Sequence, residues 1–450
     1  MQYKLGATCL LTLAISTAAL AQPAPPPLPQ AVDTKSPGQR NPANDILAAR
    51  ALAQSEGLSE AEAAQQLQVE PTIVAFIEQL EGGSLPEYAG VRLKRKPAFQ
   101  LTVFHTGPSD AFRQKLSIPA ELSPIVTFRS VKNSLRVLQA QQQRFLKSPV
   151  FRDLDFATYI DPEANRIVIQ SRANQNIRER GKQSPGIVPD DVEFVDEDVP
   201  PQTAGVAPSG AYPPKAGDWL EAGHHYHGWV LNSSGTAYEA RRECTWGFAT
   251  KLGTQYGLVT AGHCEPSDYG TGYFQNLPGH WVEHWGPDYE SNGIRTAQKY
   301  DFQFHRMPGI KVYNTVGIYN SEGTSSSATY YVNGTEGRTA QAASTSCYYG
   351  RISKFRCASV FDNNYFINEN GRTYGPWVRL YYNGTLSTAV PEGDSGGPVM
   401  NSPSGGWIKA RGIISRSKYY VTLGKIEIIY MPIDHIDDVE PIQVLTSPSP

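Results

Sequence analysis

The sequence has no excess of charge of one sign. Lys and Arg together number 40 and Asp and Glu 43, so the formal net charge is −3. This balance excludes a strongly basic surface for nucleic acid and a polybasic surface for anionic membranes. Beyond the N-terminal segment the chain also lacks an apolar run long enough to span a bilayer. We therefore expect no nucleic-acid partner and no membrane attachment of the mature chain.

The N-terminus is the one strongly apolar segment. Lys4 supplies a positive charge, an apolar run follows, and Ala19-Leu20-Ala21 ends it with small residues. A charged start, a short apolar centre and an A-x-A end are typical of a secretory signal peptide. We expect residues 1–21 to be removed and the mature protein to be secreted and extracellular. An N-terminal membrane anchor is the alternative, but the run is short for one.

Cysteine is scarce, with five in the chain, and Cys9 lies inside the signal run. The remaining four are Cys244, Cys264, Cys347 and Cys357. Four cysteines in an exported chain can pair in three ways, of which near-neighbour pairing, Cys244 with Cys264 and Cys347 with Cys357, is the simplest. Metal binding by the same four is the alternative, although no C-x-x-C spacing is present. No metal or other cofactor is expected.

A chain of 450 residues is too long for one average domain and predicts two or three units. Residues 22–45 are rich in Pro, Ala and Gln and are expected to be a disordered leader. Residues 46–172 mix helical and strand-like segments and predict a small α/β domain. Residues 173–222 are polar and then rich in Pro, Gly and Ala, which is typical of a linker where proteolytic cleavage concentrates. Residues 223–445 form the last unit.

Helical and strand patterns alternate within the predicted α/β domain. Ala and Leu dominate its first segment, Ser59 and Glu62 have the spacing of a capping box, and two glycines end the segment. Further on, a turn at Asp161-Pro162 separates two apolar stretches, which predicts a hairpin. The predicted elements are a helix over 46–81, a strand over 99–104, a helix over 131–146 and hairpin strands over 157–160 and 166–170.

From about residue 224 onward, short apolar strands are separated by turns. The whole chain contains 24 Tyr, 40 Gly and 34 Pro, a composition that favours β-structure with many turns over a helical bundle. The regular spacing of these short strands predicts an antiparallel barrel or sandwich.

The strongest chemical signal is the segment Glu392–Pro398, with the sequence EGDSGGP. A serine between glycines can lie on a tight turn with its hydroxyl exposed. Gly393 has no side chain, so its N–H can face a substrate carbonyl beside the N–H of Ser395. Two such donors form an oxyanion hole. A glycine-rich turn without chemistry is the alternative.

A second signal is VTAGHC over Val259–Cys264, which places His263 at the end of an apolar strand. A disulfide at the adjacent cysteine would hold this segment rigidly. A lone histidine is more often structural than catalytic, but here a candidate nucleophile lies downstream. Because acyl transfer needs both a nucleophile and a base, we favour a functional role for His263.

Together these two segments resemble the chymotrypsin-like serine peptidases, whose triad runs in the order His, Asp, Ser. The resemblance implies a double β-barrel with the active site between the barrels. It implies that His263 is the general base and Ser395 the nucleophile. Asp301, at the head of an alternating apolar strand, is the best match for the triad acid, and Asp288 is the runner-up. Asp394 would be a buried carboxylate that shapes the oxyanion loop.

Among these peptidases, the chain most resembles the bacterial secreted branch of alpha-lytic protease and the streptogrisins. Its two cysteine loops resemble two disulfide loops of that branch, and residues 88–104 and 157–170 resemble its pro-region. Pro398 stands where that branch usually has Ser, and a third cysteine pair near the nucleophile is absent. The implied protein is a secreted serine endopeptidase made as a zymogen, whose pro-region assists folding and blocks the site.

The same resemblance implies protein or peptide substrates, the pro-region as a partner in cis, and a monomer. Two other hypotheses remain open. One is a binding protein on the same fold with an inactive site. The other is an uncleaved protein whose N-terminal half is a permanent module.

By resemblance, the pocket for the residue before the scissile bond is lined by the segment before the nucleophile and by a strand after it. Ala389 lies six residues before Ser395, so a preference for Lys or Arg has no evident counter-charge there. Ile414 occupies the strand position where glutamate-specific relatives use His. Arg416 could attract an acidic side chain or point to solvent, and we favour solvent. We therefore expect a preference for an uncharged, medium to large apolar residue. The candidate lining residues are Ala389, Glu392, Ser415, Arg416 and Ser417.

Three histidines, His224, His225 and His227, precede the first predicted strand of the last unit. They could bind a metal ion, but a solvated N-terminal segment is the interpretation we favour.

Overall fold

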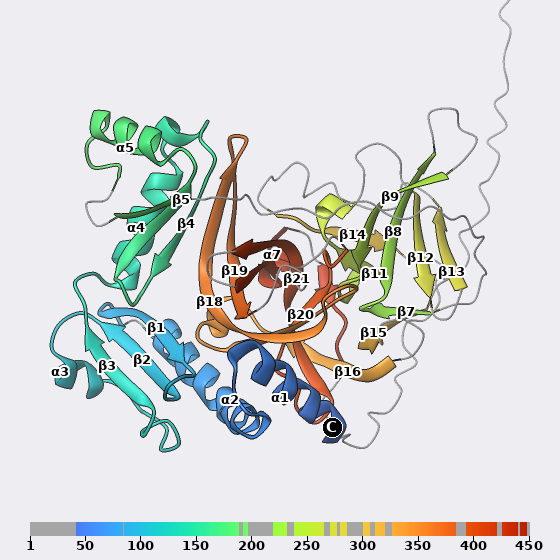
Figure 1. The fold of residues 1–450 in the computed structure, drawn as a ribbon, viewed down its shortest axis with the longest axis horizontal. Coiled ribbons are helices and arrows are strands. Elements are labelled where there is room, and N and C mark those ends of the chain that lie inside the picture. Colours follow the sequence, from blue (N-terminus) through green and yellow to red (C-terminus); the bar gives the residue numbers. More distant parts are fainter. Residues whose placement is uncertain are drawn as a thin grey trace, which may run out of the picture.

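The structure is a computed structural model. It comprises an N-terminal part of helices and short sheets and a larger part built from strands (Figure 1). The predicted signal peptide lies outside the residues that the structure describes, and no helix within those residues is long and apolar enough to cross a bilayer. The described residues are 42–83, 85–188, 192–196, 219–231, 238–264, 271–276, 280–285, 300–306, 311–319, 326–383, 393–420, 425–439 and 442–447.

The N-terminal part contains two groups of three strands with helices beside them. Its elements are α1 (Pro42–Glu56), α2 (Glu60–Gly82), β1 (Tyr88–Lys94), β2 (Gln100–His105), α3 (Ser109–Arg113), β3 (Val126–Ser130), α4 (Leu135–Leu146), η1 (Pro149–Phe151), β4 (Phe156–Asp161), β5 (Arg166–Ser171), α5 (Asn174–Gln183) and β6 (Val192–Asp196). β1, β2 and β3 form a sheet of their own. β4 and β5 form the predicted hairpin, and β6 pairs with β5 in parallel. The predicted strand over 99–104 corresponds to β2, and the helix predicted from residue 131 begins later, as α4.

The single helix predicted over 46–81 is wrong, because the segment forms two helices separated at Gly57, where φ is +67°. Ser59 is the N-cap of α2. Its hydroxyl accepts the Glu62 N–H at 3.2 Å, and the Glu62 carboxylate accepts the Ser59 N–H at 2.8 Å. The capping box therefore marks the start of a second helix. The first helix begins at Pro42, inside the segment expected to be a leader.

The linker predicted over 173–222 is wrong at both ends. α5 follows the hairpin almost directly, and β6 pairs with β5 from Ile167↔Val192 to Ser171↔Asp196. At the other end, β7 (Trp219–Ala222) pairs in parallel with β15 (Lys311–Tyr319). Polar composition hid α5, which is almost wholly hydrophilic, whereas β6 and β7 are strands of only five and four residues.

The C-terminal part is built almost entirely from strands. After β7 and together with β15, its elements are β8 (His225–Leu231), β9 (Tyr238–Thr245), β10 (Ala249–Leu252), β11 (Gln255–Thr260), η2 (Gly262–Cys264), β12 (Thr271–Asn276), β13 (His280–Trp285), β14 (Gln303–Arg306), β16 (Ser326–Thr335), η3 (Thr339–Gln341), β17 (Thr345–Gly350), β18 (Lys354–Glu369), β19 (Arg372–Asn383), β20 (Pro398–Asn401), β21 (Trp407–Tyr420), β22 (Lys425–Pro432), α7 (Asp434–Val439) and β23 (Ile442–Val444).

Six of these strands close on themselves to form a barrel. Antiparallel pairing runs β17–β18–β19–β22–β21–β20 and returns from β20 to β17. Closure gives each of the six strands a partner on both sides and leaves no open edge between the first and last. The side chains that alternate along these strands form one buried cluster: Tyr348, Ala358, Val360, Val378, Leu380, Tyr382, Val399, Ile414, Ile426, Ile428 and Tyr430.

The barrel is the second lobe. The first lobe, whose strands precede the barrel except for β23, contains two four-stranded sheets. One has the order β14–β11–β10–β23 and the other β13–β12–β8–β9. A separate buried cluster lies here, centred on the disulfide between Cys244 and Cys264 and on Trp246. The two-lobed, all-β architecture preceded by a small α/β part agrees with the predicted fold class.

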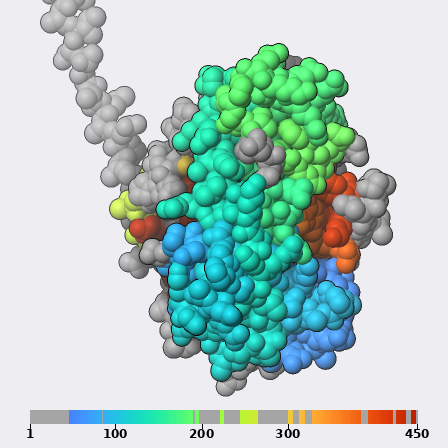
Figure 2. Space-filling view, turned by 90° about the vertical axis from the view of Figure 1, so that its left-hand side faces the viewer, coloured from blue at the N-terminus to red at the C-terminus, as the bar shows by residue number. Residues whose placement is uncertain are grey.

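The N-terminal part joins the barrel along its longest hairpin, β18–β19 (Figure 1). β4 pairs antiparallel with β18, from Phe366↔Thr158 to Asn368↔Phe156, so the sheet β6–β5–β4 continues into the barrel. α1 contacts β18 as well, and its buried residues share one core cluster with the barrel. Figure 2 views the molecule from the left-hand side of Figure 1 and shows that the N-terminal residues cover most of that face.

Arg379 on β19 is fully buried at this junction. Its guanidinium pairs with Asp362 at 3.2 Å and with Glu427 at 2.9 Å. The same group lies 3.9 Å from the centre of the Tyr159 ring on β4 and 4.1 Å from that of Tyr365. One cation therefore compensates two buried carboxylates of the barrel and stacks on an aromatic ring of the N-terminal part.

Replacing Arg379 by methionine should leave Asp362 and Glu427 buried without their cation. We expect Arg379→Met to lower the free energy of unfolding by about 3–5 kcal/mol, measured by urea denaturation of the full chain. The control is Arg50→Met, because the Arg50–Glu60 pair is 53% exposed on both sides and should be worth at most about 1 kcal/mol. Equal effects of the two substitutions would contradict this account of the junction.

Candidate active site

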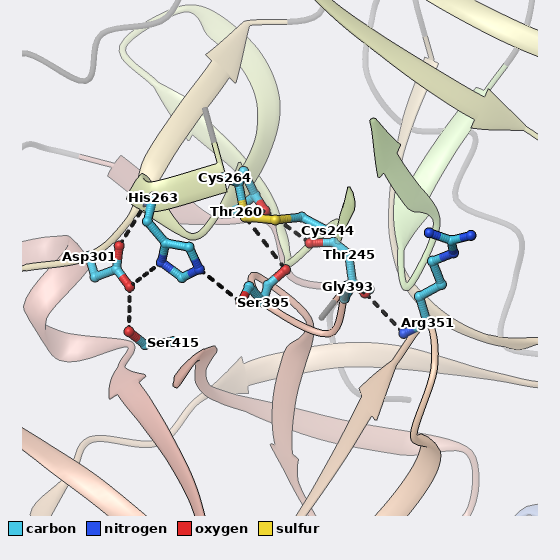
Figure 3. Close-up of a disulfide and its surroundings, with 10 residues drawn as sticks. All are labelled: Cys244, Thr245, Thr260, His263, Cys264, Asp301, Arg351, Gly393, Ser395 and Ser415. Atoms are coloured by element: carbon cyan, nitrogen blue, oxygen red, sulfur yellow. Dashed lines mark hydrogen bonds and ion pairs between the residues drawn. A yellow bond between two sulfur atoms is a disulfide. The ribbon is translucent and has the colours of Figure 1, made fainter. Parts of the chain in front are cut away.

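His263, Asp301 and Ser395 lie together where the two lobes meet (Figure 3). His263 belongs to η2, the turn that follows β11, and Asp301 lies just before β14. β11 and β14 pair with Thr260 opposite Gln303, and this register brings the carboxylate beside the histidine. Ser395 comes from the other lobe, on the turn that leads into β20. The fold therefore assembles three residues that are far apart in the sequence.

The imidazole of His263 lies between the other two side chains. Its Nδ1 is 2.8 Å from Asp301 Oδ2, and its Nε2 is 2.9 Å from Ser395 Oγ. An ionised carboxylate can only accept hydrogen bonds, so Nδ1 carries the proton and Nε2 is left to accept from the serine hydroxyl. In this tautomer His263 can remove the hydroxyl proton and activate Ser395 as a nucleophile.

Asp301 is held by three donors. Its Oδ1 accepts the backbone N–H of His263 at 3.0 Å, and its Oδ2 accepts from the His263 ring and from the hydroxyl of Ser415. Burial by itself raises the pKa of Asp301. The charge of His263 and the hydrogen bonds from His263 and Ser415 outweigh burial, so the pKa lies below its ordinary value. The carboxylate is therefore ionised at neutral pH and able to stabilise an imidazolium.

The segment that carries Ser395 is anchored by the carboxylate before it. Asp394 Oδ1 accepts the N–H of Ile352 at 2.7 Å and that of Ser353 at 3.2 Å. Burial raises the pKa of Asp394 above its ordinary value, although these hydrogen bonds oppose the shift. Gly393 has φ +121°, a conformation that residues with a Cβ rarely adopt. Among the described residues no protein group accepts the N–H of Ser395.

Both disulfides form between near neighbours. Cys244 and Cys264 are joined with a Cα–Cα distance of 6.1 Å, which ties the end of β9 to the turn that carries His263. Cys347 and Cys357 occupy directly paired positions on β17 and β18 of the barrel.

Only some of the pocket residues predicted from the sequence lie in the part of the chain that the structure describes. Ala389 and Glu392 lie outside the described residues. Ser415 lies beside the triad, where its hydroxyl donates to Asp301. Ser417 is on β21, paired with Ile428.

The expectation that Arg416 points to solvent is wrong. Its side chain is only 10% exposed, and its guanidinium pairs with Glu369 at 2.9 Å. The rings of Tyr374 and Trp377 lie within 6 Å of the same group. The pairing register of β21 shifts between Ile414 and Arg416. The charge of Arg416 is therefore compensated by a carboxylate at the tip of the β18–β19 hairpin.

The expectation of a solvated histidine segment is also wrong for His224. This side chain is 2% exposed, and burial lowers its pKa to about 3, so the ring is neutral at neutral pH. The carbonyl of His224 accepts the Trp246 N–H at 2.8 Å, which ties it to the core of the first lobe. His225 and His227 belong to β8.

Two residues were missed by the sequence analysis, one beside the triad and one that pairs with a predicted pocket residue. Thr245 contacts the segment around Ser395, and its position directly after Cys244 was a signal that could have pointed to it. Glu369 pairs with Arg416, but nothing in the sequence links these two positions, which lie on different strands.

Comparison with known proteins gives structural likeness alone. No family model and no curated protein matches the chain. It is similar to Thermobifida fusca Protease A, with TM-score 0.33 and 20% identity, to Nocardiopsis protease, with 0.34 and 18%, and to Cellulomonas bogoriensis chymotrypsin, with 0.32 and 17%. Each likeness covers 50% of this chain and 98% of the other. At these values the geometry of the triad, and not the likeness, carries the functional proposal.

The depressed pKa of Asp301 predicts a pH-dependent contribution to stability. The unfolded chain protonates this carboxylate near pH 4, whereas the folded protein does so only at lower pH, so its contribution is present above about pH 4 and lost in acid. We compare two proteins that both carry Ser395→Ala, one with Asp301 and one with Asp301→Asn. The difference between their free energies of unfolding should shrink by about 1–3 kcal/mol from about pH 5 to about pH 2. Urea unfolding at each pH measures it, and a gap that stays constant would contradict the shift.

Proposed function

We propose that this chain is a secreted serine endopeptidase that hydrolyses peptide bonds through Ser395, His263 and Asp301. The observation that carries the proposal is the pair of hydrogen bonds that holds the imidazole 2.9 Å from the hydroxyl and 2.8 Å from the carboxylate. A nucleophile in contact with a base, and a base in contact with an orienting acid, is the arrangement that acyl transfer requires. This chemistry needs no metal or cofactor.

The proposed reaction has two steps. Ser395 Oγ attacks the peptide carbonyl carbon while its proton passes to His263 Nε2. The C–N bond then breaks as the imidazolium gives that proton to the leaving amine, which leaves an ester on Ser395. Water, deprotonated by the same imidazole, hydrolyses the ester, and the proton returns to the serine. Asp301 stays ionised throughout and stabilises the imidazolium.

The N–H groups of Gly393 and Ser395 are the proposed donors to the oxyanion of the tetrahedral intermediate. The absence of a described acceptor for the Ser395 N–H supports this role. Asp394 supports it indirectly, because its carboxylate fixes the segment to the loop at Ile352 and Ser353. One such donor is worth about 100-fold to 1,000-fold in rate.

The N-terminal part, through β6, is proposed to be a pro-region of a zymogen. Its strand β4 extends the sheet of the β18–β19 hairpin, and α1 shares a core cluster with the barrel. Long-range β pairing folds slowly, so a preformed strand and helix against the hairpin would assist folding. We propose cleavage within residues 197–218, between the two folded parts, and a mature monomer.

The proposed substrates are extracellular proteins or peptides. Since Glu369 neutralises Arg416, that arginine offers no uncompensated charge to an acidic substrate residue. This argues against an acidic residue before the scissile bond, and we propose an uncharged, medium to large apolar residue there.

A panel of peptide anilides that differ only in that residue tests the preference. We expect kcat/KM for Phe, Leu or Met to exceed that for Glu, Lys or Arg by at least about tenfold, since burying an unpaired charge is costly. Fastest cleavage after Glu, Lys or Arg would overturn the preference and leave the triad untouched.

Labelling of the secreted protein with a fluorophosphonate tests the function itself. We expect the wild type to be labelled on a fragment that begins between residues 197 and 219, and Ser395→Ala to be unlabelled and unprocessed. Ser402→Ala is the control, because Ser402 follows the end of β20 and lies outside the proposed site, and it should behave as wild type. Intact mass reads the adduct and the cleavage together.

The outcomes separate the proposals. A wild type that is folded and cleaved but unlabelled would replace the enzyme by a binding protein with an inactive site. Labelling of a chain that keeps its N-terminal part would overturn the pro-region and leave the triad standing.

A further inference from the structure

Thr245 touches both ends of the segment that carries the nucleophile (Figure 3). Its backbone N–H donates to the carbonyl of Ser395 at 2.8 Å, and its hydroxyl donates to the carbonyl of Gly393 at 2.7 Å. Thr245 is fully buried and directly follows Cys244, whose disulfide partner adjoins His263. One residue thus joins the lobe that supplies the base to the segment that supplies the nucleophile.

The direction of the Thr245 hydroxyl is fixed by its other partner. The N–H of Arg351 donates to Thr245 Oγ1 at 3.0 Å. A hydroxyl has a single proton, so an oxygen that accepts from Arg351 on one side is free to donate on the other, toward Gly393. The neighbouring N–H groups, of Ile352 and Ser353, hold the Asp394 carboxylate. The loop at 351–353 therefore supports this segment twice, once directly and once through Thr245.

Thr245 is itself held in place. Its carbonyl accepts the hydroxyl of Thr260 at 3.0 Å, on the strand that leads to His263. Gly396, at φ +83°, packs so closely that a Cβ there would lie 2.5 Å from the Thr245 carbonyl and 1.9 Å from the Thr260 hydroxyl. The contact between Thr245 and the nucleophile segment is therefore tight and leaves little room for rearrangement.

We propose that Thr245 is a positioning residue that aims the N–H groups of Gly393 and Ser395 at the oxyanion. The proposal deepens the proposed function and rests on it. Oxyanion donors accelerate reactions because they are already oriented before charge develops. Gly393 is the point where that orientation is weakest, since a glycine at positive φ has the widest conformational freedom. The Thr245 hydroxyl donates to the Gly393 carbonyl and so limits the rotation of the peptide group between Gly393 and Asp394.

A role in positioning differs from a role in packing in what it changes. Loss of oriented donors weakens binding of the tetrahedral state and leaves binding of the substrate ground state intact, so kcat falls while KM is kept. A packing defect lowers stability and changes both states alike. Thr245→Val separates the two, because valine has nearly the same shape and lacks the hydroxyl.

The test compares Thr245→Val with wild type on a chromogenic peptide anilide that has an apolar residue before the scissile bond. We expect kcat to fall about tenfold, with KM changed less than about twofold and the pH profile unshifted. Inhibition by a peptide boronic acid, which forms a tetrahedral adduct on Ser395, should weaken by the same factor. Inhibition by the peptide amide of the same sequence should stay as in wild type. Thr245→Ser, which keeps the hydroxyl, should restore the rate.

Thr250→Val is the matched control. Thr250 is fully buried on β10 of the same lobe, and its hydroxyl has no hydrogen-bond partner among the described residues. Its replacement should leave kcat and boronate inhibition unchanged. If Thr245→Val does not accumulate as folded protein, Thr245→Ala is measured in the same way, because alanine fits the same space.

The other outcomes would overturn either the positioning role of Thr245 or the proposed function. Full activity of Thr245→Val, or equal weakening of the boronic acid and the amide, would overturn the positioning role. Failure of both Thr245→Val and Thr245→Ala to fold, while Thr250→Val folds, would overturn it too and make Thr245 a folding residue. A wild type that neither cleaves the anilide nor binds the boronic acid would overturn the proposed function instead.

Discussion

A carboxylate that is largely removed from water, Asp301, whose side chain is 12% exposed, is the constraint around which the candidate site is organised. Asp301 loses hydration on folding, and that loss must be offset by donors or the group would take up a proton. The offset comes from the His263 backbone, the His263 ring and Ser415. Because the ring donates through Nδ1, its Nε2 is left as an acceptor for Ser395. The need to stabilise this one partly desolvated charge thus fixes the tautomer of His263 and the hydrogen-bond partner of Ser395.

Each of the two lobes contributes groups to the hydrogen bonds around Asp301 and His263. The register of β11 against β14 sets the distance between His263 and Asp301 within the first lobe. The closed barrel of the second lobe carries Ser395 and the strand with Ser415, so a rigid unit presents both groups to the first lobe. Thr245 adds a direct bond across the junction, since it belongs to β9 and holds the carbonyls of Gly393 and Ser395.

The N-terminal part depends on the same barrel. Its strand β4 adds to the outside of β18, and the ring of Tyr159 stacks on Arg379, whose charge is already committed to two carboxylates. The described contacts of the N-terminal part fall on the β18–β19 hairpin, on η3 and on Thr345 of β17, whose N–H donates to Glu70, and none of the described N-terminal residues bonds to His263, Asp301 or Ser395. A part that binds the hairpin can therefore influence how the barrel forms while leaving the arrangement of the catalytic groups unchanged.

Local signals in the sequence pointed to three residues, His263, Asp301 and Ser395, that the fold brings together. The segments around His263 and Ser395 are short motifs that can be recognised from a few consecutive residues. Asp301 was indicated by its position at the start of an alternating apolar strand. The capping box at Ser59 was visible too, yet it was placed inside one helix, because the break at Gly57 is a single residue in an alanine-rich run. α5 was taken for linker because its residues are almost all polar and leave no apolar period to detect. β6 was missed because its alternation extends over only five residues.

Long-range contacts were beyond the reach of the sequence. Arg416 was expected in solvent because its partner, Glu369, lies on the tip of a distant hairpin, and only the folded barrel brings the two within 2.9 Å. His224 was grouped with its exposed-looking neighbours, but its backbone is bound to Trp246 and the ring is buried with the first lobe. Thr245 binds Gly393, 148 residues further along the chain, so its position after Cys244 could mark the residue but not its partner.

The most direct test of the central claim is the tautomer and bonding of His263 in solution. Selective ¹⁵N labelling of histidine in the folded protein, with His263→Ala for assignment, reports which ring nitrogen carries the proton above neutral pH. The account predicts a protonated Nδ1 with a strongly downfield proton in the bond to Asp301, and an unprotonated Nε2. A protonated Nε2, or a freely averaging ring, would mean that Asp301 does not orient His263, and would contradict the proposed acyl-transfer site.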